Sequence, residues 1–404
     1  MNKFLRMTGY ISIAMLFIFT ISFAQKVETI DGVRVVHNEK TGKWGKTPEV
    51  SIEFVKTIGD IESENENVLF YMPTNIVFDS QGNMYILDTG NHRIQKFDPD
   101  GKFITSIGRK GQGPGEFQYP ISLDVDSEGY LYISDSGNQR IQILNPDGTD
   151  HKTIQMVKEA VGPIKIAKLG HMIMGTGGFV SISPGAMDED ESLPKLLKVL
   201  NLEGEIQKEF GEKKDYNNFL MNRAGNRFHF TVDRDNNIYI SFDNQNRIEK
   251  YSPEGEILWK SDRLLNFDTT RPRQKGFDER RGGYRMFREP EMNRCSSGIA
   301  VDDKGRIWVV GLKRQIKDNE RVQTNVRVSM ETGGVRNLAM SVTGNSDVRE
   351  TDMYQLEVYA PDGILLCKLS LNQFVDDIRI EKDKLYLLDG MRGMQYYEYK
   401  IIEK

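Results

Sequence analysis

The stretch DTGNHRIQKFDPDG, residues 88–101, gathers an acid, a base and a cation within one turn, as Asp88, His92 and Arg93. Such a trio has the residue types of general acid–base chemistry. A second copy, DSGNQRIQILNPDG, runs from 135 to 148 at an offset of 47 residues and replaces His92 with Gln139. A group needed once for chemistry would not be repeated along the chain. We therefore interpret Asp88 and Arg93 as residues that bond the turn and tie neighbouring repeats together.

The elements around this stretch also repeat. A third copy runs from 230 to 255, and degenerate copies run from 163 to 204, 298 to 363 and 375 to 402. Each unit has an alternating strand, a hairpin signal of the Asp-x-x-Gly kind, two further strands, and a Pro-Asp-Gly type of turn before a fourth strand. Four antiparallel strands repeated every 40 to 50 residues are typical of propeller blades. The sequence therefore predicts an all-β, six-bladed β-propeller of four-stranded blades.

The last unit lacks a fourth strand, whereas residues 50–58, VSIEFVKTI, look like a fourth strand without a blade. Pairing this N-terminal strand with the C-terminal blade would close the ring and remove two exposed sheet edges. We assign 50–404 to the propeller, 25–49 to an N-terminal extension and 1–24 to a signal peptide.

The segment GRKGQGPGEFQYP, residues 108–120, and the D-x-x-G, D-[ST]-G-N-x-R-I and N/D-P-D-G elements resemble the NHL-repeat propellers. The resemblance is specific in three units and extends over about residues 50 to 402. It implies a six-bladed ring with a central channel. Relatives include extracellular sensor domains, protein-binding scaffolds, RNA-binding domains and a few lyases and lactonases, so the fold alone does not select a function.

In such a ring the first strand of every blade lines the channel. The residues just before these strands should converge at the channel mouth, and most of them are polar: Asn75, Ser122, Lys165, His229, Gly298 and Asp377. A polar ring at a concave mouth is a candidate ligand-binding site, and we select all but Gly298. An equally supported alternative is that these side chains simply hydrate the channel and bind no ligand.

Three long insertions, about 177–194, 262–297 and 313–353, should emerge on one face of the ring. Loops of this length in a compact domain are more often functional than idle, which favours a lid or recognition role over decoration. The second insertion is rich in arginine and forms a candidate basic loop for an anionic ligand or a glycan, although solvated and internally paired charges are the slightly favoured interpretation. Its selected residues are Arg271, Arg273, Arg280, Arg281 and Arg285.

Catalysis is the alternative function. Zinc needs three or four close ligands, and His229 is the one histidine at a channel position, so a histidine-rich centre is not expected. Asn75 and Asp377 could offer two oxygens to a divalent cation such as Ca²⁺, which prefers six to eight. We expect no cofactor and no catalytic residue. The favoured hypothesis is a non-enzymatic propeller that grips a partner protein, peptide or glycan; the alternative is a metal-assisted lyase or lactonase at the channel mouth.

The N-terminus and the composition set the compartment. Lys3 and Arg6 precede an apolar run that ends in Ser22-Phe23-Ala24, the pattern of a secretory signal peptide with no lipoprotein cysteine. We expect a periplasmic or secreted protein without a membrane span after cleavage. A net charge of −5 argues against nucleic acid as a partner. Whether Cys295 and Cys367 form a disulfide is left open.

Overall fold

The computed structural model describes residues 25–404 except 157–159, 168–170, 177–192, 282–283 and 332–333, and gives only the backbone of 278–287 and 323–341. The predicted signal peptide and nearly all of the insertion at 177–194 lie outside the described residues. No helix within the described part is long and apolar enough to cross a membrane. Cys295 and Cys367 are both buried, and their thiols are free.

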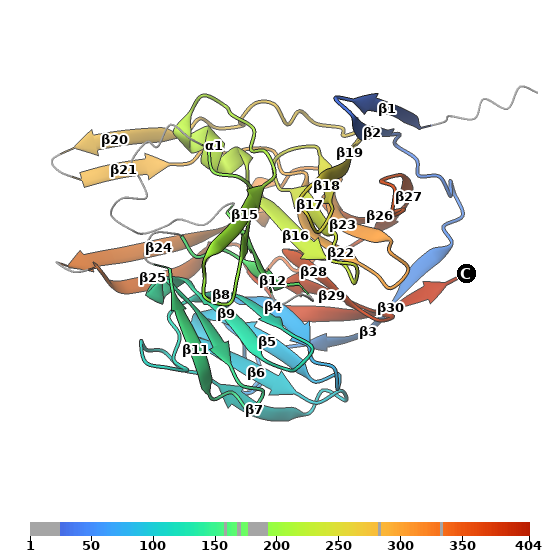
Figure 1. Cartoon of the computed structure of the whole chain (residues 1–404). Coiled ribbons are helices and arrows are strands. Elements are labelled where there is room, and N and C mark those ends of the chain that lie inside the picture. The colour runs from blue at the N-terminus through green and yellow to red at the C-terminus, as the bar shows by residue number, and fades with distance from the viewer. Residues whose placement is uncertain (1–24, 157–159, 168–170, 177–192, 282–283, 332–333) are drawn as a thin grey trace, which may run out of the picture.

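The chain folds into six antiparallel sheets arranged as the blades of a propeller (Figure 1). The prediction of a six-bladed, all-β ring is confirmed. The first two blades follow one another without insertion: β4 (Pro73–Phe78), β5 (Met84–Asp88), β6 (Arg93–Phe97) and β7 (Phe103–Ile107), then β8 (Pro120–Val125), β9 (Leu131–Asp135), β10 (Arg140–Leu144) and β11 (Asp150–Gln155).

The next two blades differ at their edges. The third is β12 (Ile164–Ile166), β13 (Met172–Gly175), β14 (Leu197–Leu200) and β15 (Ile206–Phe210), followed by the short helix α1 (Phe219–Gly225). The fourth is β16 (Phe228–Val232), β17 (Ile238–Phe242), β18 (Ile248–Tyr251) and β19 (Ile257–Arg263). Its outer edge is extended by a hairpin from the N-terminus, β1 (Lys26–Ile30) and β2 (Val33–Asn38), which makes a six-stranded sheet.

The last two blades complete the ring. The fifth is β22 (Ser296–Val301), β23 (Ile307–Leu312), β26 (Tyr354–Tyr359) and β27 (Leu365–Ser370). The sixth is β28 (Asp377–Glu381), β29 (Lys384–Asp389), β30 (Gln395–Glu403) and β3 (Val50–Ile58), with β3 antiparallel to β30 from Val50↔Glu403 to Ile58↔Tyr396. The N-terminal strand therefore supplies the missing fourth strand, as its sequence predicts.

The Asp-x-x-Gly elements form the hairpins between the first and second strands. Asp79 Oδ1 accepts from the backbone N–H of Gln81 and Asn83 at 3.0 and 2.9 Å, and Gly82 takes a φ of 84°. Asp126 and Asp302 repeat this pattern in the second and fifth blades. These aspartates are thus explained by turn formation.

Two of the three insertions are built around hairpins. The insertion at 262–297 contains β20 (Phe277–Arg281) and β21 (Tyr284–Arg288), and that at 313–353 contains β24 (Val322–Glu331) and β25 (Gly334–Gly344). Both hairpins project from the same side of the ring (Figure 1). Their bases are joined because Glu291 Oε1 lies 3.2 Å from Arg273 Nη1 and 3.0 Å from Arg321 Nη2.

The N-terminal segment runs along the outer strands of three successive blades. Strand β2 pairs in parallel with β19 of the fourth blade, and the N–H groups of Lys43 and Trp44 donate to Leu365 and Leu366 of the fifth, each at 2.9 Å. Strand β3 then joins the sixth. We call residues 26–58 the belt, because they cover the edges of half of the ring and satisfy backbone groups that would otherwise be exposed.

Asn38 is the side chain that anchors the belt between two blades. It is buried, and its Nδ2 donates to Ser261 Oγ at 2.7 Å and to the carbonyls of Asp262 and Gly363 at 3.0 Å. Its Oδ1 accepts from the N–H of Leu365 at 2.7 Å. Both ends of the amide are therefore committed.

We predict that Asn38→Ala lowers the free energy of unfolding by about 2–3 kcal/mol, because it leaves buried donors and acceptors unpaired. Urea unfolding followed by circular dichroism measures the change. Lys40→Ala, at an exposed position of the same belt, is the control and should stay within about 0.5 kcal/mol of the parent. Equal effects of the two substitutions would show that the belt is not anchored at Asn38.

Candidate functional site

The turn that carries Asp88 and Arg93 is a structural element that recurs in the first two blades. Asp88 Oδ2 accepts from Arg93 Nε at 2.9 Å and from Asn91 Nδ2 at 2.8 Å, while Oδ1 accepts from the N–H of Tyr71 at 2.7 Å. His92 is buried, and its Nδ1 accepts from the N–H of Tyr119 at 3.0 Å. Burial lowers the pKa of His92 to about 4, so the ring is neutral and engaged.

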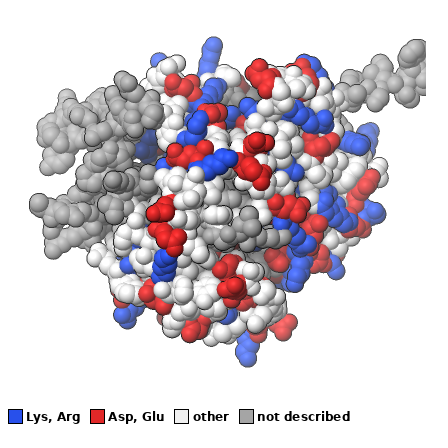
Figure 2. All heavy atoms as spheres, in the orientation of Figure 1, with Lys and Arg blue, Asp and Glu red and all other residues white. Residues whose placement is uncertain are grey.

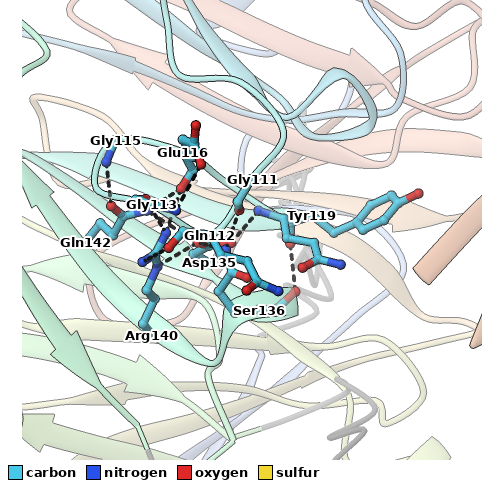
Figure 3. Close-up of polar contacts among 12 residues, drawn as sticks. Gly111, Gln112, Gly113, Gly115, Glu116, Tyr119, Asp135, Ser136, Arg140 and Gln142 are labelled. Atoms are coloured by element: carbon cyan, nitrogen blue, oxygen red, sulfur yellow. Dashed lines mark hydrogen bonds and ion pairs between the residues drawn. The ribbon is translucent and has the colours of Figure 1, made fainter. Parts of the chain in front are cut away.

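The second blade repeats this arrangement (Figure 3). Asp135 Oδ2 accepts from Arg140 Nε at 3.0 Å, and Oδ1 accepts from the N–H of Gln118 at 2.7 Å. The Arg140 guanidinium also donates to the carbonyls of Gln112, Gly113 and Glu116 at 2.7–2.8 Å. The Asp–Arg pair therefore holds the loop that enters the blade, which agrees with its interpretation as a structural pair.

A cavity of about 1060 Å³ occupies the centre of the ring, lined chiefly by the first strands of the blades. All five selected channel residues, Asn75, Ser122, Lys165, His229 and Asp377, line this one cavity. The remainder of the wall combines apolar residues, among them Ile121, Phe228 and Ile299, with charged ones such as Asp376 and Arg379. The repeat register thus brings the predicted residues together; that they bind a ligand stays a prediction.

Two of these residues are occupied by bonds between blades. Asn75 Oδ1 accepts from the N–H of Leu123 in the next blade at 3.0 Å. Ser122 Oγ accepts from the N–H of Ile164 at 3.1 Å and donates to its carbonyl at 3.3 Å. Ser122 therefore both donates and accepts, whereas the Nδ2 of Asn75, a residue of the cavity wall, has no hydrogen-bond partner among the described residues.

His229 lies between two carboxylates. Its Nε2 is 3.3 Å from Asp243 Oδ1, and its Nδ1 is 3.6 Å from Asp377 Oδ1. Asp377 belongs to the sixth blade and His229 to the fourth, so this contact crosses the fifth. Gly298 of the fifth blade makes the crossing possible, because a Cβ there would lie 3.0 Å from Asp377 Oδ1 and 2.9 Å from Ile378 Cγ2.

This arrangement fixes the charge of His229. Burial alone would lower its pKa, but the attraction of the Asp243 and Asp377 carboxylates outweighs this effect and raises the pKa to about 10. In turn, the positive charge of His229 lowers the pKa of Asp243, although burial alone would raise it. His229 is therefore an imidazolium at neutral pH, with a carboxylate at each ring nitrogen.

Lys165 and Arg379 are two cations of the channel wall whose charged groups lack a bonded partner among the described residues. Both are half-buried in the channel wall, and neither has a hydrogen bond or an ion pair within the described part of the chain. Burial lowers the pKa of Lys165, with Asp124 and Asp377 opposing this and Arg379 adding to it by repulsion. Arg379 Nε is buried without a hydrogen-bond partner.

The sequence analysis missed Arg379 and Asp243, although a signal for each was present. Arg379 is two residues after Asp377, and alternate residues of a strand share a face, so it points into the same channel. Asp243 follows a break in the repeat: Phe242 stands where Asp88 stands in the first blade. Arg247, which replaces Arg93, instead packs its guanidinium 3.9 Å from the centre of the Phe242 ring.

The candidate basic loop lies apart from the cavity, whose lining includes no described residue of the 262–297 or 313–353 insertion. Arg273 is engaged with Glu291, and Arg271 is exposed. Arg280, Arg281 and Arg285 are on the β20–β21 hairpin, where the side chains lie outside the described residues. The lid role therefore stays a prediction.

Charges of both signs are interspersed over the face seen in Figure 2. Among the described residues, no three His, Cys, Asp or Glu side chains are grouped so that they could hold a metal ion.

Comparison with known proteins places these features in a family. Residues 24–281 match the family model DUF5128, described as a 6-bladed β-propeller. No curated protein matches the sequence.

Solved structures share the fold at low sequence identity. A DUF4221 member from Bacteroides vulgatus aligns with a TM-score of 0.57 and 11% identity over 89% of this chain and 100% of that one. A presumed exported protein of Bacteroides fragilis aligns at 0.53 and 10%, over 92% and 99%. Virginiamycin B lyase from Staphylococcus aureus aligns at 0.45 and 12%, over 87% and 100%, a likeness too weak to argue from.

We predict that Arg140→Met destabilises the fold by about 3–5 kcal/mol, because it leaves Asp135 buried without its cation. Chemical unfolding measures the loss. Arg109→Met is the matched control: Arg109 is 82% exposed beside Glu116, and its removal should cost less than about 1 kcal/mol. A loss at Arg140 no larger than that at Arg109 would contradict a structural role for the Asp–Arg pair.

We also predict a pH signature for His229. Its folded pKa of about 10 is above the ordinary 6.5, so its ion pairs stabilise the fold fully below pH 6.5 and lose that effect as the pH rises to about 10. The stability difference between the parent and His229→Gln should therefore be largest near pH 6 and narrow toward pH 10. Urea unfolding at several pH values tests this. A stability difference that does not vary with pH would contradict the ion pairs of His229 with Asp243 and Asp377.

Proposed function

The chain belongs to the DUF5128 family of six-bladed β-propellers, and from that fold and its channel we propose that it is an exported, non-enzymatic binding protein whose channel mouth takes up a ligand. We also propose that the blades are NHL-type repeats, on the basis of their sequence pattern. Export rests on the signal-peptide pattern of residues 1–24 and agrees with the fold shared with a presumed exported protein.

The observation that carries the proposal is the state of His229 in an otherwise open cavity. A general base needs a free lone pair and a pKa near the working pH. His229 has a carboxylate at each nitrogen and a pKa raised to about 10, so it offers neither. The same ion pairs occupy the nitrogens that a metal would require.

The cavity itself suits binding. Its volume of about 1060 Å³ is at the upper end of the range of small-molecule sites, and its wall combines apolar surface with polar and charged groups that could orient a ligand. The inter-blade bonds of Asn75 and Ser122 hold the first strands in place, which keeps such a site preformed. The projecting hairpins would then form a second surface of the protein, which binds a partner protein, peptide or glycan.

The test uses N-phenyl-1-naphthylamine, a neutral apolar dye that fluoresces on leaving water. We expect saturable binding to the intact protein. Ile121→Trp should abolish it by filling the channel, whereas Ile104→Trp, at a position 47% exposed on the outer strand β7, should leave it unchanged. Absence of saturable binding, or equal binding by the two variants, would overturn the proposal that the channel takes up a ligand.

A further inference from the structure

Among the charged side chains of the channel wall, a closed group and an open group can be distinguished by their ion pairs. The closed group is the His229 imidazolium with Asp243 and Asp377, in which each nitrogen faces an oxygen. The open group is Lys165 and Arg379, which line the same cavity without an ion-pair partner among the described residues. A ligand could therefore reach Lys165 and Arg379 without displacing an existing ion pair.

Placing two cations near one another in a half-buried wall is unfavourable. Burial and the repulsion of Arg379 both lower the pKa of Lys165, and an unpaired buried Nε on Arg379 loses its hydration without compensation. The nearby carboxylates do not remove this cost. Asp377 is engaged with His229, and Asp124 Oδ2 accepts from the N–H of Ile166 at 2.7 Å.

A third donor belongs to a residue of the same cavity wall. Asn75 Oδ1 accepts from the N–H of Leu123 in the next blade, and its Nδ2 has no hydrogen-bond partner among the described residues. The three groups come from the first, third and sixth blades, so the ring closure brings them to one cavity. Three donors, two of them cations without an ion-pair partner among the described residues, favour a negatively charged group on a ligand of this cavity.

We propose that Lys165, Arg379 and the Asn75 amide form a subsite for the anionic head of a small organic acid, whose apolar body lies against Ile121, Phe228 and Ile299. The ligand class is a carboxylate or sulfonate on an apolar skeleton. This rests on the proposed function, since it assumes that the channel takes up a ligand. Charge-assisted bonds to two cations in a partly dry wall would dominate its affinity.

The experiment compares two dyes that differ by one charged group. 8-Anilinonaphthalene-1-sulfonate is N-phenyl-1-naphthylamine with a sulfonate added, so the pair isolates the anionic head. We expect the sulfonate to bind the channel at least about tenfold more tightly than the neutral dye, the gain from one good charge-assisted contact. Ile121→Trp should abolish the binding of both.

Variants then locate the head group. Lys165→Met and Arg379→Gln should each weaken the sulfonate by about tenfold or more and leave the neutral dye within about twofold. Lys102→Met, an exposed cation beyond the channel, should change neither. Raising the salt concentration should weaken the sulfonate alone, which provides a measurement on the parent protein should either variant fail to fold.

The outcomes separate the two proposals. Equal affinities for the two dyes, with no effect of Lys165→Met, would overturn the anion subsite while leaving the binding channel in place. If neither dye binds, the channel proposal fails and the subsite fails with it. Sulfonate binding that persists in Ile121→Trp would place the dye outside the channel and likewise overturn the subsite.

Discussion

Closure of the ring by pairing of β3 with β30 is the constraint on which the rest of this structure depends. Hydrogen bonds along Val50–Ile58 join the two ends of the chain, and the belt continues this contact over the outer strands of three blades. A closed ring has no free sheet edge at the join. It also fixes the distance across the channel, so residues from blades that are remote in the sequence face one another at defined positions.

Repetition within the ring supplies rigidity, and departures from it supply the site. The Asp–Arg pairs of the first two blades hold loops and leave no free polar group for a ligand. Where the fourth blade has Phe242 in place of the aspartate, Arg247 packs on that ring and Asp243 is available to pair with His229. Gly298, which has no side chain at its channel position, lets Asp377 reach the same histidine.

The resulting charges are the basis of our proposal that the channel binds a ligand rather than catalyses a reaction. His229 is enclosed by two carboxylates and held as a cation, which removes the one channel histidine from acid–base work near neutral pH. Asp243 and Asp377 are in turn engaged in ion pairs with His229. Lys165 and Arg379 are left in the cavity wall without an ion-pair partner among the described residues, which is the basis of the proposed subsite for a negative head group.

The sequence by itself determined the six blades, the closing strand and the register of the channel residues, because these follow from a local pattern that recurs along the chain. It could also place Lys165, His229 and Asp377 at one mouth, since equivalent positions of a closed ring converge. Arg379 was within reach of the same reasoning through its alternation with Asp377.

Which of these groups are paired was decided only by the tertiary structure. Asn75 and Ser122 look equally polar in the sequence, yet Ser122 both accepts from and donates to Ile164, whereas the Nδ2 of Asn75 has no partner among the described residues. The ion pair of His229 with Asp377 joins the fourth blade to the sixth. It passes over the fifth blade at Gly298, which has no side chain in the way. The hydrogen bonds and pKa values of a channel depend on distances between residues far apart in the chain, and a repeat pattern carries no such distances.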